Sequence, residues 1–341
     1  MPAAKTATET PRVYVVIATW NNHDDAIECL DALVRSDYPN FAVVLCDNAS
    51  ADGTLDRIRR WAEAPTPYRR PAGSPLGAAA EPLAPVPLVV HDRAAAERGG
   101  GADDAGARLV LVQTGANLGY AGGNNVGLRY ALARGDADYL WLLNGDTVVA
   151  ADGIARLVAF AGAHPEAGLI GAPLLDYDDP SLLQAYGGAS WDAARAEAHR
   201  LGEGAPADAR PPVDQLDLLV GVSMFATRAW VETVGLLEER YFLYCEEVDW
   251  ATRGRGRFAL AVAPEARVFH KMHTAGKSGW TWRRWYYFQR ARLLFTARFH
   301  PRHLATVGAL VAKALARRLV VIATHYAATT VKRALPGMRP Q

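Results

Sequence analysis

The sequence predicts an α/β protein with a mainly parallel sheet flanked by helices. Several short, continuously apolar runs rich in β-branched residues are typical of strands that are buried on both faces. Segments of helical period alternate with these runs, which is the order of a doubly wound sheet. The chain has 341 residues, half of them hydrophobic, which is enough for one large domain and a tail.

The first β–α–β unit covers residues 13–54. Residues 13–18 (VYVVIA) are predicted as a buried strand, and the polar residues 19–22 follow it. Residues 23–36 have helical period, and residues 41–46 form the second predicted strand. Because polar residues follow both strands, we expect them to meet at the sheet edge where open α/β sheets bind ligands.

Residues 63–108 interrupt this alternation. The segment is rich in Pro, Ala and Gly and contains few large apolar residues. Such a composition buries too little apolar surface to order itself. We therefore expect a flexible insertion, in which only residues 88–90 touch the sheet.

Regular structure is predicted again after the insertion. Residues 109–112 and 139–143 are predicted strands, with a helix over 121–134 between them. Asn144-Gly145-Asp146 follows the second of these strands. The triplet is a common turn sequence, but an aspartate at a strand end also suits a divalent ion, which prefers oxygen ligands.

The glycine-rich segment Asn117–Asn125 (NLGYAGGNN) precedes that helix. Glycines allow a backbone to approach a ligand closely, and they also allow a tight turn that begins a helix. Both interpretations remain open from the residues alone.

Three acids lie close together at Glu246, Glu247 and Asp249. They repel one another and sit between apolar residues, and both effects raise the pKa of a carboxyl group. A carboxylate tuned in this way suits general-base catalysis. Alternatively, the acids stabilise the start of a helix, by about 0.3–1 kcal/mol each.

Charge is separated along the chain. All 36 acidic residues lie at or before Glu265, whereas residues 267–341 contain 15 Lys and Arg and no acid. A basic, apolar segment suits an anionic membrane surface. Three cations interrupt the apolar residues 304–331, leaving pieces shorter than the roughly 18–20 residues of a spanning helix. We expect an amphipathic helix in the interface, with a helix packed on the domain or a hairpin dipping into the bilayer as alternatives.

The N-terminus and the cysteines indicate a cytoplasmic protein. Residues 1–11 contain no apolar targeting segment and are predicted to be disordered. The three cysteines are odd in number and lack metal-ligand spacing, which fits a reducing compartment. We expect residues 12–300 to form the catalytic domain and 301–341 a basic amphipathic tail on the inner face of the cytoplasmic membrane. Trp282 and Trp285 are candidates for sugar stacking or for interface anchoring.

The order of these motifs resembles glycosyltransferase family 2, inverting enzymes of the GT-A fold, and most of all its bacterial rhamnosyltransferase-type members. The GT-A fold is a Rossmann-like nucleotide-diphospho-sugar transferase fold with a mixed, mainly parallel sheet. The resemblance runs from Val13 to about Phe299, apart from the insertion. The segments that carry it are LCDNASADGT at 45–54, NLGYAGGNN at 117–125, NGD at 144–146, FLYCEEVDW at 242–250, PEARVFH at 264–270 and YYFQRARLLF at 286–295.

The resemblance implies a nucleotide diphosphate sugar donor, a dTDP- or UDP-sugar with dTDP-rhamnose as the leading candidate, and a lipid-linked or glycan acceptor. Asp47 would accept a hydrogen bond from a pyrimidine edge. Residues 218–225 would shape the acceptor side. The positions that match donor-binding residues of the family are Thr19, Asn21, Asp47, Asn48, Asn117, Gly119, Gly122, Asn124, Asn125, Asn144 and Asp146.

By the same resemblance, Asp146 and His270 would hold a divalent metal, Mg²⁺ or Mn²⁺. Asn144 and Gly145 stand where the family often has further acids, so the affinity for the ion would be modest. His273 is a rival ligand. Glu247 would be the catalytic base, with Glu246 or Asp249 positioning the acceptor or the helix N-terminus.

Other functional classes fit the sequence less well. A nicotinamide-dependent oxidoreductase should carry GxGxxG after the first strand, where this chain has Thr19-Trp20-Asn21-Asn22. A nucleic-acid binder is disfavoured because the tail is apolar and lacks a recognition module. A catalytically idle nucleotide-sugar-binding or scaffold protein of the same fold remains an alternative, because the acidic triplet contains a single aspartate.

Overall fold

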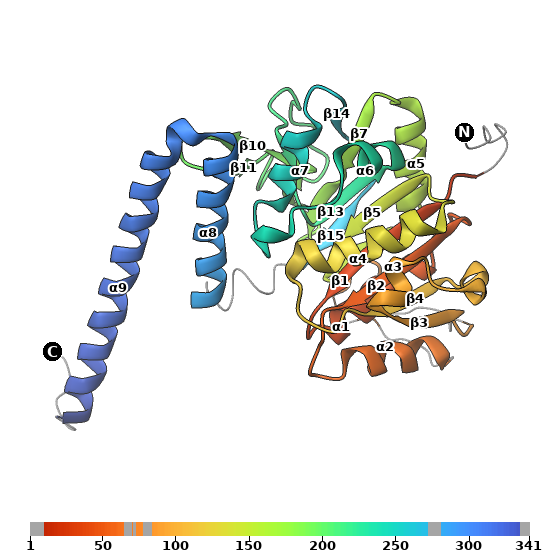
Figure 1. Ribbon diagram of the computed structural model, residues 1–341, viewed down its shortest axis with the longest axis horizontal. Coiled ribbons are helices and arrows are strands. Elements are labelled where there is room, and N and C mark those ends of the chain that lie inside the picture. The colour runs from red at the N-terminus through yellow and green to blue at the C-terminus, as the bar shows by residue number, and fades with distance from the viewer. Residues whose placement is uncertain (1–9, 65–69, 71–72, 78–83, 272–280, 335–341) are drawn as a thin grey trace.

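The computed structural model describes residues 10–64, 70, 73–77, 84–271 and 281–334, the last 14 of these by backbone only. An eight-stranded sheet forms its centre, in the order β14-β7-β13-β5-β1-β2-β4-β3 (Figure 1). Only β13 runs antiparallel to its neighbours in this sheet, so the predicted mixed, mainly parallel sheet is confirmed. The strands are β1 (Val13–Thr19), β2 (Phe41–Asp47), β3 (Leu88–Asp92), β4 (Leu109–Gln113), β5 (Tyr139–Leu143), β7 (Ala167–Gly171), β13 (Ser223–Thr227) and β14 (Ala259–Val262).

The central strands are buried on both faces, as their apolar sequences predict. Alternate residues of β1 point to opposite faces, so Val15 and Tyr14 belong to two separate cores. One core includes residues of α1 (His23–Val34), α2 (Thr54–Glu63) and α5 (Gly153–Ala163). The other includes residues of α3 (Arg93–Glu97), α4 (Gly119–Arg134), α6 (Arg228–Val234) and α7 (Glu246–Gly254).

The strand register aligns the carboxyl ends of the central strands. Thr19 pairs with Asp47, and Asp47 pairs with Gln113 across β1, β2 and β4. The polar residues that follow these strands therefore begin at one level, which places them together at one edge of the sheet.

Two smaller sheets lie beside the main one. The first has the order β6-β15-β8-β9 and consists of β6 (Thr147–Val149), β15 (Val268–His270), β8 (Pro173–Asp176) and β9 (Leu183–Tyr186). In it His270 pairs with Thr147, which brings this histidine next to the Asn144–Asp146 turn. The second has the order β11-β10-β12 and consists of β11 (Glu197–Arg200), β10 (Gly188–Asp192) and β12 (Leu218–Leu219).

Part of the predicted flexible insertion is regular structure, which corrects that expectation. β3 pairs with β4 as the edge strand, α3 follows it, and a 3-10 turn η1 covers Ala102–Gly106. Buried Asp104 accepts hydrogen bonds from Tyr130 at 2.7 Å and pairs with His91 Nε2 at 2.8 Å. These long-range contacts order a segment whose local composition is that of a loop. Residues 65–69, 71–72 and 78–83 of the insertion lie outside the described residues.

The C-terminal part of the chain forms a helical hairpin. A short 3-10 turn, η2 (Glu239–Tyr241), precedes α7, and the hairpin consists of α8 (Trp282–Phe299), the turn η3 (Pro301–His303) and α9 (Leu304–Ala334). α9 packs on α8 and lies on its far side from the sheets (Figure 1). Residues 1–9, 272–280 with the rival ligand His273, and 335–341 lie outside the description. Across the part of the chain that is described, no helix combines the length and apolarity needed to cross a bilayer.

Candidate active site

The loops that follow β1 and β2 are tied together at the carboxyl edge of the sheet. Asn21, whose φ is +51°, accepts a hydrogen bond from Ala51 N at 2.8 Å, and its own N–H donates to Ser50 Oγ at 2.8 Å. Ser50 N approaches both carboxylate oxygens of Asp47 at 3.3 Å. Thr19 is buried, and its Oγ1 has no hydrogen-bond partner among the described residues. Such an unmatched polar atom is a natural contact for a ligand.

The glycine-rich segment makes a tight turn at the start of α4. Gly119 has φ +73°, and a Cβ added there would collide with the carbonyl oxygen of Phe242. Tyr120 N donates to that same oxygen at 2.8 Å, and Asn117 Oδ1 accepts from Gly119 N at 3.0 Å. Asn48 Nδ2 donates to Gly119 O at 2.9 Å. The turn thus connects β2 to the loop that precedes α7.

Replacing Gly119 by alanine should therefore lower the free energy of unfolding by about 2–5 kcal/mol, since it combines backbone strain with a steric clash. Gly135, at the other end of α4, has φ +78° and nothing within 4 Å of an added Cβ. Gly135→Ala should thus cost only the conformational part, about 1–2 kcal/mol. Urea denaturation of both variants checks this, and equal losses would contradict the close approach.

Several of the predicted donor-binding residues also make contacts within the protein. Asn125 is buried and uses its amide on Leu237 O, Leu237 N and Glu239 Oε1, at 2.9, 3.0 and 2.9 Å. A Cβ on Gly122 would lie 2.7 Å from Leu118 Cβ. The amide of Asn48 is also occupied, by the glycine turn. These contacts fix the positions of Asn48, Gly122 and Asn125 beside the glycine turn.

Asn124 and Asn144 differ from this group. Asn124 Nδ2 donates to Tyr120 O at 2.9 Å, but its buried Oδ1 has no partner within the described chain. Asn144 is half-buried, its N–H donates to Val222 O at 2.9 Å, and its carbonyl accepts from Thr147 Oγ1 at 2.7 Å. The backbone of the Asn144–Asp146 turn is therefore fixed to the 221–222 loop.

Asp146 and His270, the two predicted metal ligands, face each other with 3.5 Å between Asp146 Oδ1 and His270 Nε2. Burial raises the pKa of the Asp146 carboxyl, but the hydrogen bond and charge of His270, together with nearby Lys271, outweigh it and leave this pKa below its ordinary value. Lys271 also donates its N–H to Asp146 O at 3.0 Å and pairs through Nζ with Asp25 at 2.7 Å. Lys271 thus links the Asn144–Asp146 turn to α1.

Gln184 on β9 fixes the tautomer of His270. Its Nε2 donates to His270 O at 2.8 Å and to Asp176 Oδ2 at 3.2 Å, so its Oε1 is the atom that meets His270 Nδ1 at 2.8 Å. Nδ1 then carries a proton in either charge state of the ring, while Nε2 donates to the Asp146 carboxylate when the ring is charged and presents its lone pair when the ring is neutral. Two electron-pair donors that face each other suit a bound cation.

The pair does not form a complete protein cage for a metal. In the described ranges, no three or more His, Cys, Asp or Glu side chains are grouped so as to hold an ion. Asp146 and His270 fit an ion whose remaining ligands come from substrate or water, which is the usual arrangement where a hard cation binds with phosphates.

A strained loop presents the acids of α7. Phe242, Tyr244 and Cys245 all have φ between +65° and +72°, a conformation that costs about 1–3 kcal/mol each in residues other than glycine. α8 packs on this loop, because Phe242 stacks on Tyr287 at 4.4 Å and Tyr244 meets Phe288 edge-on at 5.5 Å. Such strain persists where surrounding structure enforces it, and it is common at functional sites.

Glu246 and Glu247 differ in exposure. Glu246 is buried, whereas Glu247 is half-buried. Burial raises the pKa of both carboxyl groups, and the charge of Glu247 raises that of Glu246 further. Burial and the charges of both glutamates also raise the pKa of Tyr120, whose hydroxyl donates to Gly221 O. The glutamates therefore lie near the same 221–222 loop that holds the Asn144–Asp146 turn.

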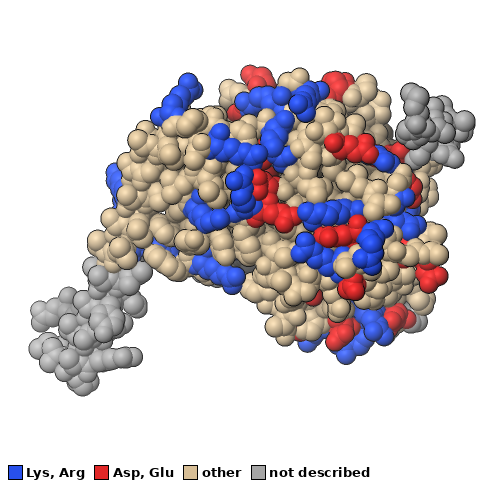
Figure 2. Space-filling view, viewed as in Figure 1, with Lys and Arg blue, Asp and Glu red and all other residues tan. Residues whose placement is uncertain are grey.

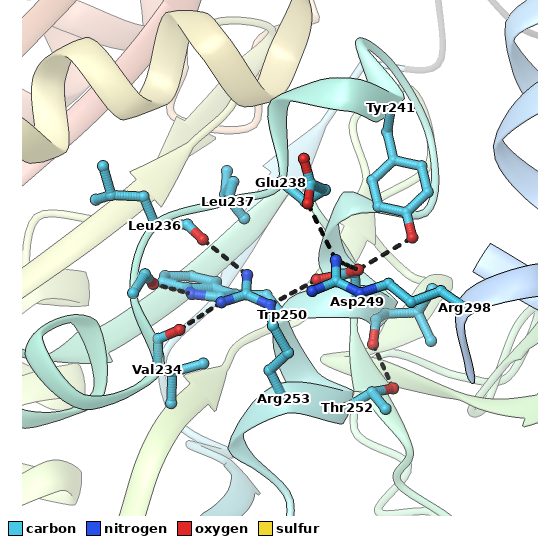
Figure 3. Close-up of polar contacts among 12 residues, drawn as sticks. Val234, Leu236, Leu237, Glu238, Tyr241, Asp249, Trp250, Thr252, Arg253 and Arg298 are labelled. Carbon is cyan, nitrogen blue, oxygen red and sulfur yellow. Dashed lines mark hydrogen bonds and ion pairs between the residues drawn. The ribbon is translucent and has the colours of Figure 1, made fainter. Parts of the chain in front are cut away.

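Asp249 lies in a buried network of polar contacts (Figure 3). Its carboxylate is fully buried and accepts from Arg253 Nε at 2.6 Å, Tyr241 OH at 3.0 Å and an Arg298 NH group at 2.8 Å. Arg253 also donates to the carbonyls of Val234 and Leu236. Asp249 thus joins α7 to α8 and to the preceding loop.

Two contributors to the site, Gln184 and Tyr287, were not predicted individually. Tyr287 lies in the segment 286–295 that carries part of the family resemblance. Gln184 has no comparable signal, because its contact with His270 depends on the pairing of β9 and β15 with β8.

The sequence and the fold both match known glycosyltransferases. Residues 14–79 match the model of glycosyl transferase family 2. The N-acetylglucosaminyl-diphospho-decaprenol L-rhamnosyltransferases of two Mycobacterium tuberculosis strains, CDC 1551 / Oshkosh and ATCC 25618 / H37Rv, are 30% identical over 190 residues. The match covers 49% of this chain and 60% of the relatives' length, so it spans less than two thirds of them.

Solved structures share the fold at low sequence identity. The mannosyltransferase PcManGT from Pyrobaculum calidifontis, in complex with GDP-Man and Mn²⁺, superposes with a TM-score of 0.52 at 18% identity, over 96% of this chain and 83% of that one. S. aureus TarS gives a TM-score of 0.50 at 12% identity, over 88% of this chain and 43% of that one. The chain therefore has the GT-A fold, and its residues 14–79 are similar to glycosyl transferase family 2.

Proposed function

We propose that the protein is a metal-dependent inverting glycosyltransferase that transfers a sugar from a nucleotide diphosphate donor to a lipid-linked or polysaccharide acceptor in cell-surface glycan synthesis. The leading donor is dTDP-rhamnose, in keeping with the rhamnosyltransferase named among its relatives. One observation carries the proposal: the 221–222 loop contacts both the Asn144–Asp146 turn and Tyr120, which lies beside Glu246 and Glu247. The protein acts at the inner face of the cytoplasmic membrane, with an anionic membrane surface as a partner.

The nucleotide binds at the ends of β1 and β2. Asp47 accepts from a ring N–H of the base, since a carboxylate that receives one N–H retains free lone pairs. Thr19 Oγ1, which has no partner in the described residues, supplies a further contact. Asn21 holds the two loops around this position.

Asp146 and His270 would hold the divalent ion, Mg²⁺ or Mn²⁺, which when bound would offset the negative charge of the diphosphate leaving group. The His270 tautomer set by Gln184 and the ionised Asp146 carboxylate prepare both side chains for this role.

Glu247 acts as the general base. It accepts the proton of the acceptor hydroxyl as that oxygen forms a bond to the anomeric carbon, and the bond from this carbon to the diphosphate oxygen breaks. Displacement from the face opposite the leaving group inverts the configuration. The raised pKa of Glu247 makes it a stronger base than an exposed glutamate.

Gln184→Leu should weaken Mn²⁺ binding by about 10- to 100-fold, because the tautomer and orientation of His270 are then no longer fixed. Free Mn²⁺ measured by electron paramagnetic resonance in a titration of the protein gives the affinity without any turnover. Gln215→Leu, at an exposed glutamine, is the matched control and should leave the affinity unchanged. An unchanged affinity in Gln184→Leu would remove Gln184 from the account.

The function is tested by incubating the protein with a panel of dTDP- and UDP-sugars, Mg²⁺ or Mn²⁺ and a lipid-linked acceptor. We expect release of nucleoside diphosphate from one donor and its loss in EDTA. Tight donor binding without release under any condition would favour the idle nucleotide-sugar-binding alternative. Absence of donor binding would contradict the proposal.

A further inference from the structure

The α8–α9 hairpin presents an exposed apolar stripe. Leu315, Leu319 and Val320 of α9 are 37%, 52% and 61% exposed. Leu304 is exposed as well, and the spacing of Leu304, Leu315 and Leu319 places them on one face of the helix. Val307, about 60–120° around the helix from these leucines, is fully buried. The helix therefore packs through one side and leaves a row of large aliphatic residues open on another.

Cations border this stripe. Lys313 and Arg317 are exposed and lie four residues apart, next to Val320 and on the side of the exposed face away from the three leucines. Arg318 lies on the other border, with its guanidinium 5.2 Å from the Trp282 ring and 5.6 Å from the Trp285 ring. No acidic residue occurs in this part of the sequence, and the visible face of the hairpin in Figure 2 shows Lys and Arg but no Asp or Glu.

The aromatic end of the hairpin lies next to the candidate active site. Trp282 and Tyr286 are 48% and 52% exposed at the start of α8, and Trp282 stacks on Trp285 at 5.1 Å. Arg283 lies 5.9 Å from the ring of Trp20, which follows β1 at the carboxyl edge of the sheet. The exposed aromatics and the donor loops are therefore neighbours.

We propose that this face of the hairpin, formed by Trp282, Tyr286, Lys313, Leu315, Arg317 and Leu319, docks on an anionic lipid bilayer. An aliphatic stripe bordered by cations, with tryptophan at one end, matches the layers of a bilayer interface, where acyl chains lie below anionic head groups. A second copy of the chain fits less well, because it would bring two surfaces of the same charge together.

The bilayer would lie beside the end of α8 that contacts the β1–α1 loop. In this respect the inference rests on the proposed function: a lipid-linked acceptor would approach Glu247 from the membrane, while the nucleotide donor enters from solution. The contacts of Tyr287 and Phe288 with the loop before α7 connect the docking hairpin to the catalytic acids.

The test is sedimentation of the full chain with vesicles of phosphatidylcholine alone or with about one third phosphatidylglycerol. We expect binding to the anionic vesicles only. Lys313→Gln with Arg317→Gln should weaken it by about fivefold per cation, or about 25-fold together. Leu315→Ser with Leu319→Ser should weaken it by about tenfold or more through lost apolar contact. Arg59→Gln with Arg156→Gln, two exposed arginines of the catalytic domain, is the control of equal charge and should bind as wild type.

Failure of wild type to bind anionic vesicles would overturn the docking proposal, as would equal weakening in the control. Self-association through the stripe without vesicle binding, detected by light scattering, would overturn it in favour of a second copy. Vesicle binding requires neither donor nor turnover. Nucleoside diphosphate release without vesicle binding would therefore count against docking and the membrane partner but not against the transferase activity, and vesicle binding without release would count against that activity alone.

Discussion

Replacing Glu247 by glutamine should lower the turnover number by about 10²- to 10⁴-fold, because the variant has no base to accept the acceptor proton. Donor binding should remain, since the proposed donor contacts come from the β1 and β2 loops and from Asp146 and His270, whereas Glu247 lies on α7. Initial rates of nucleoside diphosphate release give the turnover number, and calorimetric titration with the donor gives the affinity. Glu232→Gln, at an exposed glutamate of α6, should retain wild-type turnover.

The pH dependence provides an independent check on this base. Burial raises the pKa of Glu247, and only the ionised form accepts a proton. Turnover should thus be present above this raised pKa and fall as the pH decreases through it, at higher pH than for an ordinary glutamate. Full activity in Glu247→Gln would contradict the assignment.

Asp249→Ala should lower the free energy of unfolding by about 3–5 kcal/mol, the largest stability loss that we expect from a single substitution here. The change removes a fully buried carboxylate and leaves Arg253 and Arg298 without its charge, while Tyr241 OH loses its acceptor. Urea denaturation followed by circular dichroism gives the free energy.

Asp152→Ala is the matched control, because Asp152 pairs with Arg156 on the surface in the same i,i+4 arrangement as Asp249 and Arg253. A surface pair of this kind contributes about 0.3–0.5 kcal/mol. If Asp249→Ala were as stable as Asp152→Ala, the carboxylate would not hold α7 to α8, and Asp249 would again be a candidate for direct contact with substrate.

The sequence predicts the central sheet because its strands have strong local signals. Residues 13–18 and 41–46 are short, apolar and β-branched, and a strand buried on both faces requires that pattern. β3 lacks it, since residues 88–92 are only partly buried at the sheet edge, and their order comes from pairing with β4.

The site is predictable in part for a similar reason. The pairing of Asp146 with His270 follows from the family resemblance, but the role of Gln184 depends on strand pairing that leaves no local pattern. Among the acids of α7, helical spacing separates Glu247 from Glu246 and Asp249, which lie three residues apart on the buried side. Asp249 also stands four residues before Arg253, a spacing that indicates an ion pair and could have identified its structural role.

The configuration of the product at the anomeric carbon tests the central claim most directly. The donor is first identified from the nucleotide-sugar panel. Nuclear magnetic resonance of the early product then gives the configuration at its anomeric carbon, before the two anomers can interconvert. We predict inversion relative to the donor in wild type, and no product above background in Glu247→Gln. Retention of configuration would contradict a single displacement assisted by Glu247 as base.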